Sequence, residues 1–124
     1  MRQKSFIGDI PSLYLIATPI GNLEDMTFRA VKILNLVDIV YCEDTRVSGK
    51  LLHHYEIKKP LKQYHDFNKE FKSVEIINNL KEGKNIALIS DAGYPLISDP
   101  GYYVIREAIK EGFNVISIPG ANAL

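Results

Sequence analysis

Residues 85–109 read NIALISDAGYPLISDPGYYVIREAI, and this stretch decides the fold, because an apolar run is followed by a turn-rich loop and then by a helix-like segment. The apolar run is short and β-rich, which predicts a buried strand. In the loop, Gly93 lets the backbone turn sharply and Pro95 fixes the exit direction. Asp99 and Pro100 are typical of the residue before a helix and of its first position. A strand, a loop and a helix therefore follow one another here.

The same alternation of short apolar runs and helix-period segments recurs along the whole chain. Strands are expected at residues 13–19, 38–43, 61–65, 85–90 and 114–119, and helices at 27–36, 46–55, 68–82 and 101–111. Strands separated by helices can satisfy their backbone groups in one parallel sheet with right-handed crossovers. The sequence therefore predicts an α/β fold with a five-stranded, mainly parallel sheet and helices on both faces.

Helix ends and apolar helix faces are also predicted by residue type. Thr27 is expected to cap the first helix, and Gly83 occupies a good position after the end of the third. The apolar residues that recur at helical spacing are expected to face the sheet. These are Phe28, Ala30, Val31, Ile33 and Leu34 in the first helix, Phe71, Val74, Ile77 and Leu80 in the third, and Val104, Ile105, Ala108 and Ile109 in the fourth.

Length, charge and cysteine usage narrow the class of protein. The 124 residues suffice for one core, with residues 1–12 expected as a flexible leader and 13–124 as the domain. Fifteen basic and fifteen acidic side chains cancel, so a nucleic-acid or membrane partner would have to use a local patch. A single cysteine and the lack of an 18-residue apolar run favour a cytoplasmic protein without membrane contact.

Four loops are expected to meet at one edge of the sheet, because the carboxyl ends of parallel strands gather there and ligands bind there. Their sequences are TPIGNLED, CEDTR, SDAGYPLISDPG and PGANAL. None matches the dinucleotide fingerprint or the phosphate-binding P-loop. Asp91 is either a ligand-binding group or an Asx-turn residue. Glu43, Asp44 and Arg46 form either a functional group of charges or a self-contained salt bridge.

A local basic segment follows the second loop, between residues 46 and 65. It holds five cations, Arg46, Lys50, Lys58, Lys59 and Lys62, against one acid, Glu56. Tyr55 and Tyr64 are candidate stacking surfaces, a combination suited to single-stranded nucleic acid. The alternative is an ordinary solvated face. The three histidines of this segment lack metal-site spacing and partner cysteines, so no metal is expected.

The loops together resemble a known family. The stretches LYLIATPIGNLEDMTFRA, YCEDTR, ISDAGYPLISDPG and IPGANAL are similar, in order and spacing, to the tetrapyrrole methylase superfamily, from about Leu13 to Leu124. They look like its bacterial 16S rRNA cytidine 2'-O-methyltransferase branch. Branches that methylate tetrapyrroles have a glycine-rich first loop, whereas TPIGNLED favours RNA as substrate. The resemblance covers the amino-terminal half of a two-domain methyltransferase, without the carboxy-terminal domain.

The resemblance implies S-adenosylmethionine as cofactor, 16S ribosomal RNA of the small subunit as partner, and a homodimer. The positions implied to bind the cofactor are Ile20, Asp91, Ala92, Gly93, Tyr94, Asn122 and Ala123. Transfer of a methyl group to a ribose hydroxyl also calls for a base, for which Glu43 or Asp44 is the candidate. Arg46 would hold the RNA backbone or orient the carboxylate. Lys50, Lys58, Lys59 and Lys62 are the candidate RNA contacts.

Two other functions use the same features. Glu43, Asp44 and Asp91 could hold Mg²⁺ at the strand ends and support phosphoryl transfer. Alternatively, the basic segment alone could make the chain a noncatalytic RNA-binding module, with Lys58, Lys59 and Lys62 as its main contacts.

Overall fold

The computed structural model describes residues 10–17, 26–64, 68–90 and 99–118. The strands are β1 (Ser12–Ala17), β2 (Ile39–Cys42), β3 (Leu61–Gln63), β4 (Ile86–Ser90) and β5 (Asn114–Ile118). The helices are α1 (Phe28–Leu36), α2 (Thr45–His54), α3 (Lys69–Lys81) and α4 (Asp99–Lys110). Every expected element is confirmed within a few residues. Helix α4 begins earlier than predicted, so Asp99 is its first residue and not the residue before it.

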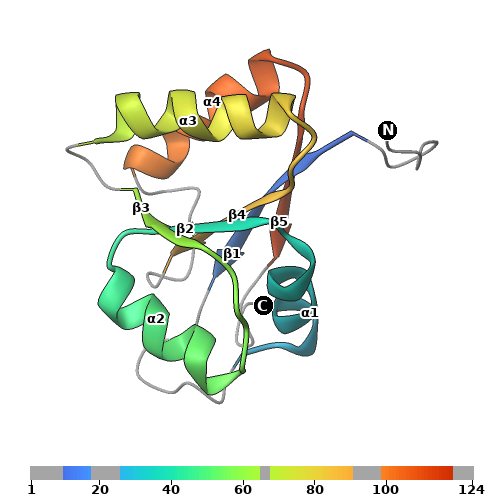
Figure 1. The fold of residues 1–124 in the computed structure, drawn as a ribbon. Helices are drawn as coiled ribbons and strands as arrows, with labels where there is room; N and C mark the ends of the chain where they lie inside the picture. Colours follow the sequence, from blue (N-terminus) through green and yellow to red (C-terminus); the bar gives the residue numbers. More distant parts are fainter. Residues whose placement is uncertain (1–9, 18–25, 65–67, 91–98, 119–124) are drawn as a thin grey trace.

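The five strands form one sheet in the order β3-β2-β4-β1-β5, and all four pairings are parallel. The chain moves in one direction across the sheet through α1 and α2, and in the opposite direction through α3 and α4. Because parallel crossovers are right-handed, a reversal of direction moves the helices to the other face. Figure 1 shows this arrangement, with α1 and α2 below the sheet and α3 and α4 above it. The predicted fold is confirmed.

The core is divided by the sheet into two layers, because successive strand residues point to opposite faces. On the α3/α4 side, buried strand residues such as Leu15 and Tyr41 pack against helix residues such as Ile76 and Val104. On the α1/α2 side, Val40 and Ile89 belong to the layer that includes Ala30, Leu34 and Leu52. Since β1, β2 and β4 are buried on both faces, they read in the sequence as continuous apolar runs.

The helix ends confirm two of the predicted signals. The side-chain oxygen of Thr27 accepts a hydrogen bond from the Ala30 N–H at 3.1 Å and caps α1. Gly83 follows α3 with φ of 92°, and its N–H donates to the Leu80 carbonyl at 3.0 Å. A left-handed glycine with this bond is typical of a Schellman ending, and it fixes the direction in which the chain enters β4.

Several predicted helix faces are wrong at particular residues. Phe28, Phe71, Val74 and Ile109 were expected to face the sheet, but their exposed fractions are 85%, 73%, 59% and 60%. The buried face of α3 instead includes Ser73, because the Tyr64 side chain fills the space beside it and the two hydroxyl groups are 3.0 Å apart. A small residue is needed there, so α3 is rotated and its first two predicted apolar positions point to solvent.

Candidate active site at the carboxyl edge of the sheet

Four strand ends lie side by side at one edge of the sheet. Ala17, at the end of β1, is paired with Ser90, at the end of β4. On the other side of β4, Cys42 at the end of β2 is paired with Ile89. Ile118 at the end of β5 is paired with Ile16 of β1. The four loops that the sequence predicts to converge therefore start from four neighbouring strands, β2, β4, β1 and β5.

The chain leaves neighbouring strand ends toward opposite faces. The connections after β1 and β2 lead to α1 and α2 on one face, whereas the connection after β4, the strand between them, leads to α4 on the other (Figure 1). Such reversals open a crevice beyond the carboxyl ends of the strands, which is where ligands bind in open α/β sheets. The edge at the end of β4 is therefore the candidate active site.

The described floor of this edge is apolar. Ala17, Cys42 and Ile118 end their strands with exposed fractions of 3%, 1% and 1%. Nucleoside-sized ligands bind in sites lined mainly by apolar groups with a few polar anchors. Because these side chains are almost fully buried, they support the edge from beneath, and a ligand would contact mainly the residues that follow them. The residues predicted to bind the cofactor, Ile20, Asp91, Ala92, Gly93, Tyr94, Asn122 and Ala123, lie outside the described residues, so their assignment stays a prediction.

The turn between β2 and α2 carries the predicted base. Asp44 is the residue before α2, and its Oδ1 accepts a hydrogen bond from the Arg46 N–H at 2.9 Å. The Arg46 Nε lies 3.4 Å from the same oxygen. Both interactions lower the pKa of Asp44, and the hydrogen bond from the Arg46 backbone N–H has the larger effect. Asp44 therefore acts as a helix cap with its own ion pair, as the salt-bridge alternative expected, and a lowered pKa makes it a poorer base.

Glu43 is placed differently from its neighbour. Its side chain is exposed and, within the described part of the chain, its carboxylate has no hydrogen-bond or ion-pair partner. Its backbone carbonyl accepts a hydrogen bond from the Gln63 Nε2 at 3.0 Å. Of the two predicted acids, Asp44 is therefore engaged in capping α2, whereas the Glu43 carboxylate is exposed at the edge of the sheet. Gln63 was not among the predicted site residues.

The basic segment is divided between the two faces of the sheet. Lys50 lies on the exposed surface of α2, Lys58 is exposed and Lys59 is half-buried. No ion pair joins any of these three to an acid among the described residues. Lys62 lies on the other face, 3.1 Å from the Glu75 Oε2 on α3. The structure therefore does not bring the four predicted RNA contacts onto one surface.

The two predicted stacking tyrosines are not open platforms. Tyr64 is 1% exposed and belongs to the core on the α3/α4 side, so this prediction is wrong. Burial raises the pKa of Tyr64 to about 12. Tyr55 is half-buried against the opposite core layer, and its ring meets the His54 ring edge-on at 4.8 Å. Stacking on bases by these two side chains would require their core contacts to be given up.

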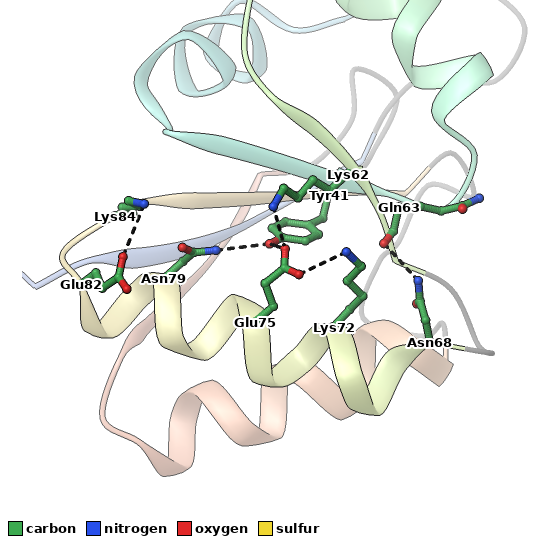
Figure 2. A network of polar contacts seen from close by, with 9 residues as sticks. All are labelled: Tyr41, Lys62, Gln63, Asn68, Lys72, Glu75, Asn79, Glu82 and Lys84. Atoms are coloured by element: carbon green, nitrogen blue, oxygen red, sulfur yellow. Dashed lines mark hydrogen bonds and ion pairs between the residues drawn. The ribbon is translucent and has the colours of Figure 1, made fainter.

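Glu75 is the centre of a polar network that the sequence did not indicate. Figure 2 shows its carboxylate between the Tyr41 hydroxyl, which donates to Oε2, and the ammonium groups of Lys62 and Lys72, both at 3.1 Å. The Asn79 amide donates to the Tyr41 oxygen at 3.3 Å. Burial raises the pKa of Glu75, but the bonds from Tyr41 and the lysines outweigh it and the net shift is downward. The pKa of Tyr41 is raised, mainly by burial and further by the hydrogen bond to Glu75 and the negative charge of that carboxylate.

Two properties of the described residues bear on the alternatives. No group of three or more histidine, cysteine or acidic side chains suited to a metal ion lies within residues 10–17, 26–64, 68–90 and 99–118. Asp91, one of the three acids of the magnesium hypothesis, is outside these ranges. Over the same part of the chain, no helix has the length and apolar character needed to span a membrane.

A parallel sheet with helices on both faces belongs to the class of open α/β domains, which bind their ligands at the carboxyl ends of the strands. The comparison with known families gives the particular one. Residues 12–124 match the family described as "Tetrapyrrole (Corrin/Porphyrin) Methylases", and the chain belongs to this family. The predicted resemblance is confirmed over nearly the whole chain.

Similar curated proteins point to one branch of the family. The chain is 56% identical to "Ribosomal RNA small subunit methyltransferase I" of Bacillus subtilis, over 98% of this chain and 42% of that protein. It is 50% identical to the protein of the same name from Thermotoga maritima, over 90% of this chain and 50% of that protein. The chain thus spans two fifths to one half of the length of these relatives.

Solved structures share the fold at lower identity. A cobalt precorrin-4 methyltransferase superposes with a TM-score of 0.73 at 21% identity, over 88% of this chain and 45% of that one. The uroporphyrin-III-C-methyltransferase of Thermus thermophilus gives 0.71 at 21% identity, over 88% and 46%. Identities this low establish the fold alone.

Proposed function

We propose that the chain is the cofactor-binding domain of an S-adenosylmethionine-dependent methyltransferase that methylates the ribose 2'-hydroxyl of a cytidine in 16S ribosomal RNA of the small subunit. The observation that carries the proposal is that four adjacent strands end at one edge of the sheet, with buried apolar residues at their ends and the exposed acid Glu43 beside them. The relatives named as small-subunit ribosomal RNA methyltransferases support the substrate class. The protein would act in the cytoplasm as a homodimer.

The cofactor would be held mainly by main-chain groups of the loops that follow β1, β4 and β5. The small residues Ala92, Gly93 and Ala121 would leave peptide groups accessible, while Ile20 and Tyr94 would supply apolar surface. Asn122 would give a polar anchor, and the Asp91 carboxylate would balance a positive charge. When bound, S-adenosylmethionine supplies an already activated methyl group on a sulfonium centre.

The chain's own task in the reaction is to position the ribose and accept its proton. Alignment of the reacting groups can supply up to roughly 7–11 kcal/mol of the barrier, so positioning dominates. The Glu43 carboxylate would take the proton of the 2'-hydroxyl, since it lies at the edge of the sheet without a described partner. Asp44 serves the turn as the cap of α2, and Arg46 beside it would contact the RNA backbone.

RNA would approach over α2 and the segment that follows it. Arg46 and Lys50 are one helical turn apart on α2 and both are exposed. Lys58 and Lys59 continue the cationic surface after the helix. Phosphate binding by such side chains is electrostatic and weakens as salt rises. Lys62 is committed to Glu75 on the other face and is left out of this surface.

The test is a methylation assay with small-subunit RNA and isotope-labelled S-adenosylmethionine, followed by digestion to nucleosides. We expect label in 2'-O-methylcytidine, and slower transfer by Glu43→Gln with unchanged binding of S-adenosylhomocysteine. Asp44→Asn is the matched control, because an asparagine still caps the helix and a neighbouring charge is lost. Label on a base, or equal rates for Glu43→Gln and the unaltered chain, would contradict the proposal.

A further inference from the structure

The pairing of β2 with β3 is extended by a side chain at the point where the candidate active site begins. The last described main-chain bond between the two strands runs from the Tyr64 N–H to the Cys42 carbonyl, at 2.7 Å. One residue later, the Glu43 carbonyl accepts a hydrogen bond from the Gln63 Nε2, at 3.0 Å. The amide of Gln63 therefore fixes the first residue of the turn that carries the proposed base.

The other side of this turn is fixed as well. The Asp44 carboxylate accepts the Arg46 N–H at 2.9 Å, and the Asp44 carbonyl accepts the Ser48 N–H at 3.1 Å as α2 begins. Glu43 is thus held between a bond to its own carbonyl and a cap on the following residue. In the described part of the chain, the Glu43 carboxylate has no partner and is available to a ligand.

Gln63 can hold the turn because its own strand is held by α3. β3 has only three residues and lies at the edge of the sheet, a position that would otherwise be loose. On one side of Gln63, Lys62 pairs with Glu75, and on the other the Tyr64 hydroxyl contacts the Ser73 hydroxyl at 3.0 Å. The Asn68 amide donates to the Gln63 carbonyl at 3.3 Å, a bond that Figure 2 shows.

We propose that Gln63 is a positioning residue, which fixes the β2–α2 turn through the Glu43 carbonyl and so holds the Glu43 carboxylate at the site edge. Its catalytic consequence rests on the proposed function. Groups that react must be held close to the productive geometry by neighbours that are themselves fixed. The chain of contacts from α3 through β3 to Glu43 supplies that support from outside the site.

The test compares three variants of the labelled chain by NMR. Gln63→Met keeps the length of the side chain but has no N–H, and Gln63→Lys keeps a donor. Glu82→Ala is the control, because it breaks an exposed pair with Lys84 away from β3. In Gln63→Met we expect the carbonyl carbon resonance of Glu43 to shift and the Arg46 amide to exchange about fivefold faster, as for the loss of one hydrogen bond.

The lysine variant and the control should keep the exchange rate of the unaltered chain within a factor of two, which is the rescue that a general loss of stability would not give. Equal exchange in Gln63→Met and the unaltered chain, or equal acceleration in all three variants, would overturn the proposal. In the methylation assay, Gln63→Met should lower kcat and leave KM unchanged. Methyl label on a base would count against the proposed function, while the NMR comparison would still decide the role of Gln63.

Discussion

Replacing Glu75 should show how strongly the polar network above the sheet contributes to stability. Its carboxylate accepts bonds from the Tyr41 hydroxyl, Lys62 and Lys72. The Tyr41 side chain is fully buried, so the loss of its acceptor costs roughly 1–3 kcal/mol. The Lys62 side chain is 42% exposed, and an exposed pair contributes only about 0–1 kcal/mol. We therefore expect Glu75→Ala to lower the free energy of unfolding by about 1–4 kcal/mol.

The measurement is urea-induced unfolding followed by circular dichroism. Glu75→Gln should cost less than Glu75→Ala, since the amide oxygen still accepts from Tyr41 while the charge is lost. The matched control is Glu82→Ala, which breaks the more exposed pair with Lys84, at 3.4 Å, and should cost at most about 1 kcal/mol. If Glu75→Ala and Glu82→Ala were equally mild, the hydroxyl bond would not have the weight given to it here.

The pH dependence of the Glu75 effect follows from the direction of its pKa shift. Its folded pKa lies below the ordinary value of 4.5, so its stabilisation is present above pH 4.5 and is lost as the pH falls through the folded pKa. The difference in unfolding free energy between the unaltered chain and Glu75→Gln should therefore shrink in acid. A difference that grew as the pH fell would refute the assigned sign.

Three further results are expected. Thr27→Ala should lower the free energy of unfolding in urea by about 1 kcal/mol, because α1 loses its cap, whereas Thr27→Ser should keep most of that stability. Equal stability of the alanine and serine variants would contradict the capping role of Thr27. The folded pKa of Tyr64 is raised to about 12, so the stability that Tyr64 contributes is present below pH 10 and is lost as the pH rises toward 12. Tyr64→Phe should therefore make the free energy of unfolding less dependent on pH in this range. An unchanged pH dependence would argue against a raised pKa of Tyr64. Lys50→Ala should reduce the slope of log affinity for single-stranded RNA against log salt by about 0.7, whereas Lys84→Ala, paired with Glu82, should leave it unchanged; equal slopes would exclude α2 as the RNA surface.

The sheet could be predicted because its strands are buried on both faces and appear as uninterrupted apolar runs. The faces of the helices were harder. In α3, the stripe through Phe71 and Val74 and the stripe through Ser73 and Ile76 fit helical spacing equally well. Tyr64, which follows β3, determines which stripe is buried, because its hydroxyl contacts the Ser73 hydroxyl of α3. Only the packed structure contains that information.

The candidate site was predicted in part for a similar reason. Strand ends are readable from the sequence, so the β2–α2 turn could be selected, but an aspartate after a strand and before a helix fits both a base and a cap. The bond to the Arg46 N–H decides that Asp44 is a cap. Gln63 was missed because its role depends on the pairing of β3 with β2, and the strand order follows from packing rather than from local pattern.

The most direct test of the central claim is an NMR titration of the chain with S-adenosylhomocysteine, with and without Mg²⁺. Under the proposed function the chain supplies one part of the cofactor cleft, so it should bind weakly, with a dissociation constant on the order of 1 mM, or about 4 kcal/mol. We expect shifts at the strand ends Ala17, Ser90 and Ile118 and in residues 91–94 and 119–123, independent of Mg²⁺. Resonances at these strand ends that stay unchanged at several millimolar ligand, or that shift only with Mg²⁺, would contradict a methyltransferase site at this edge.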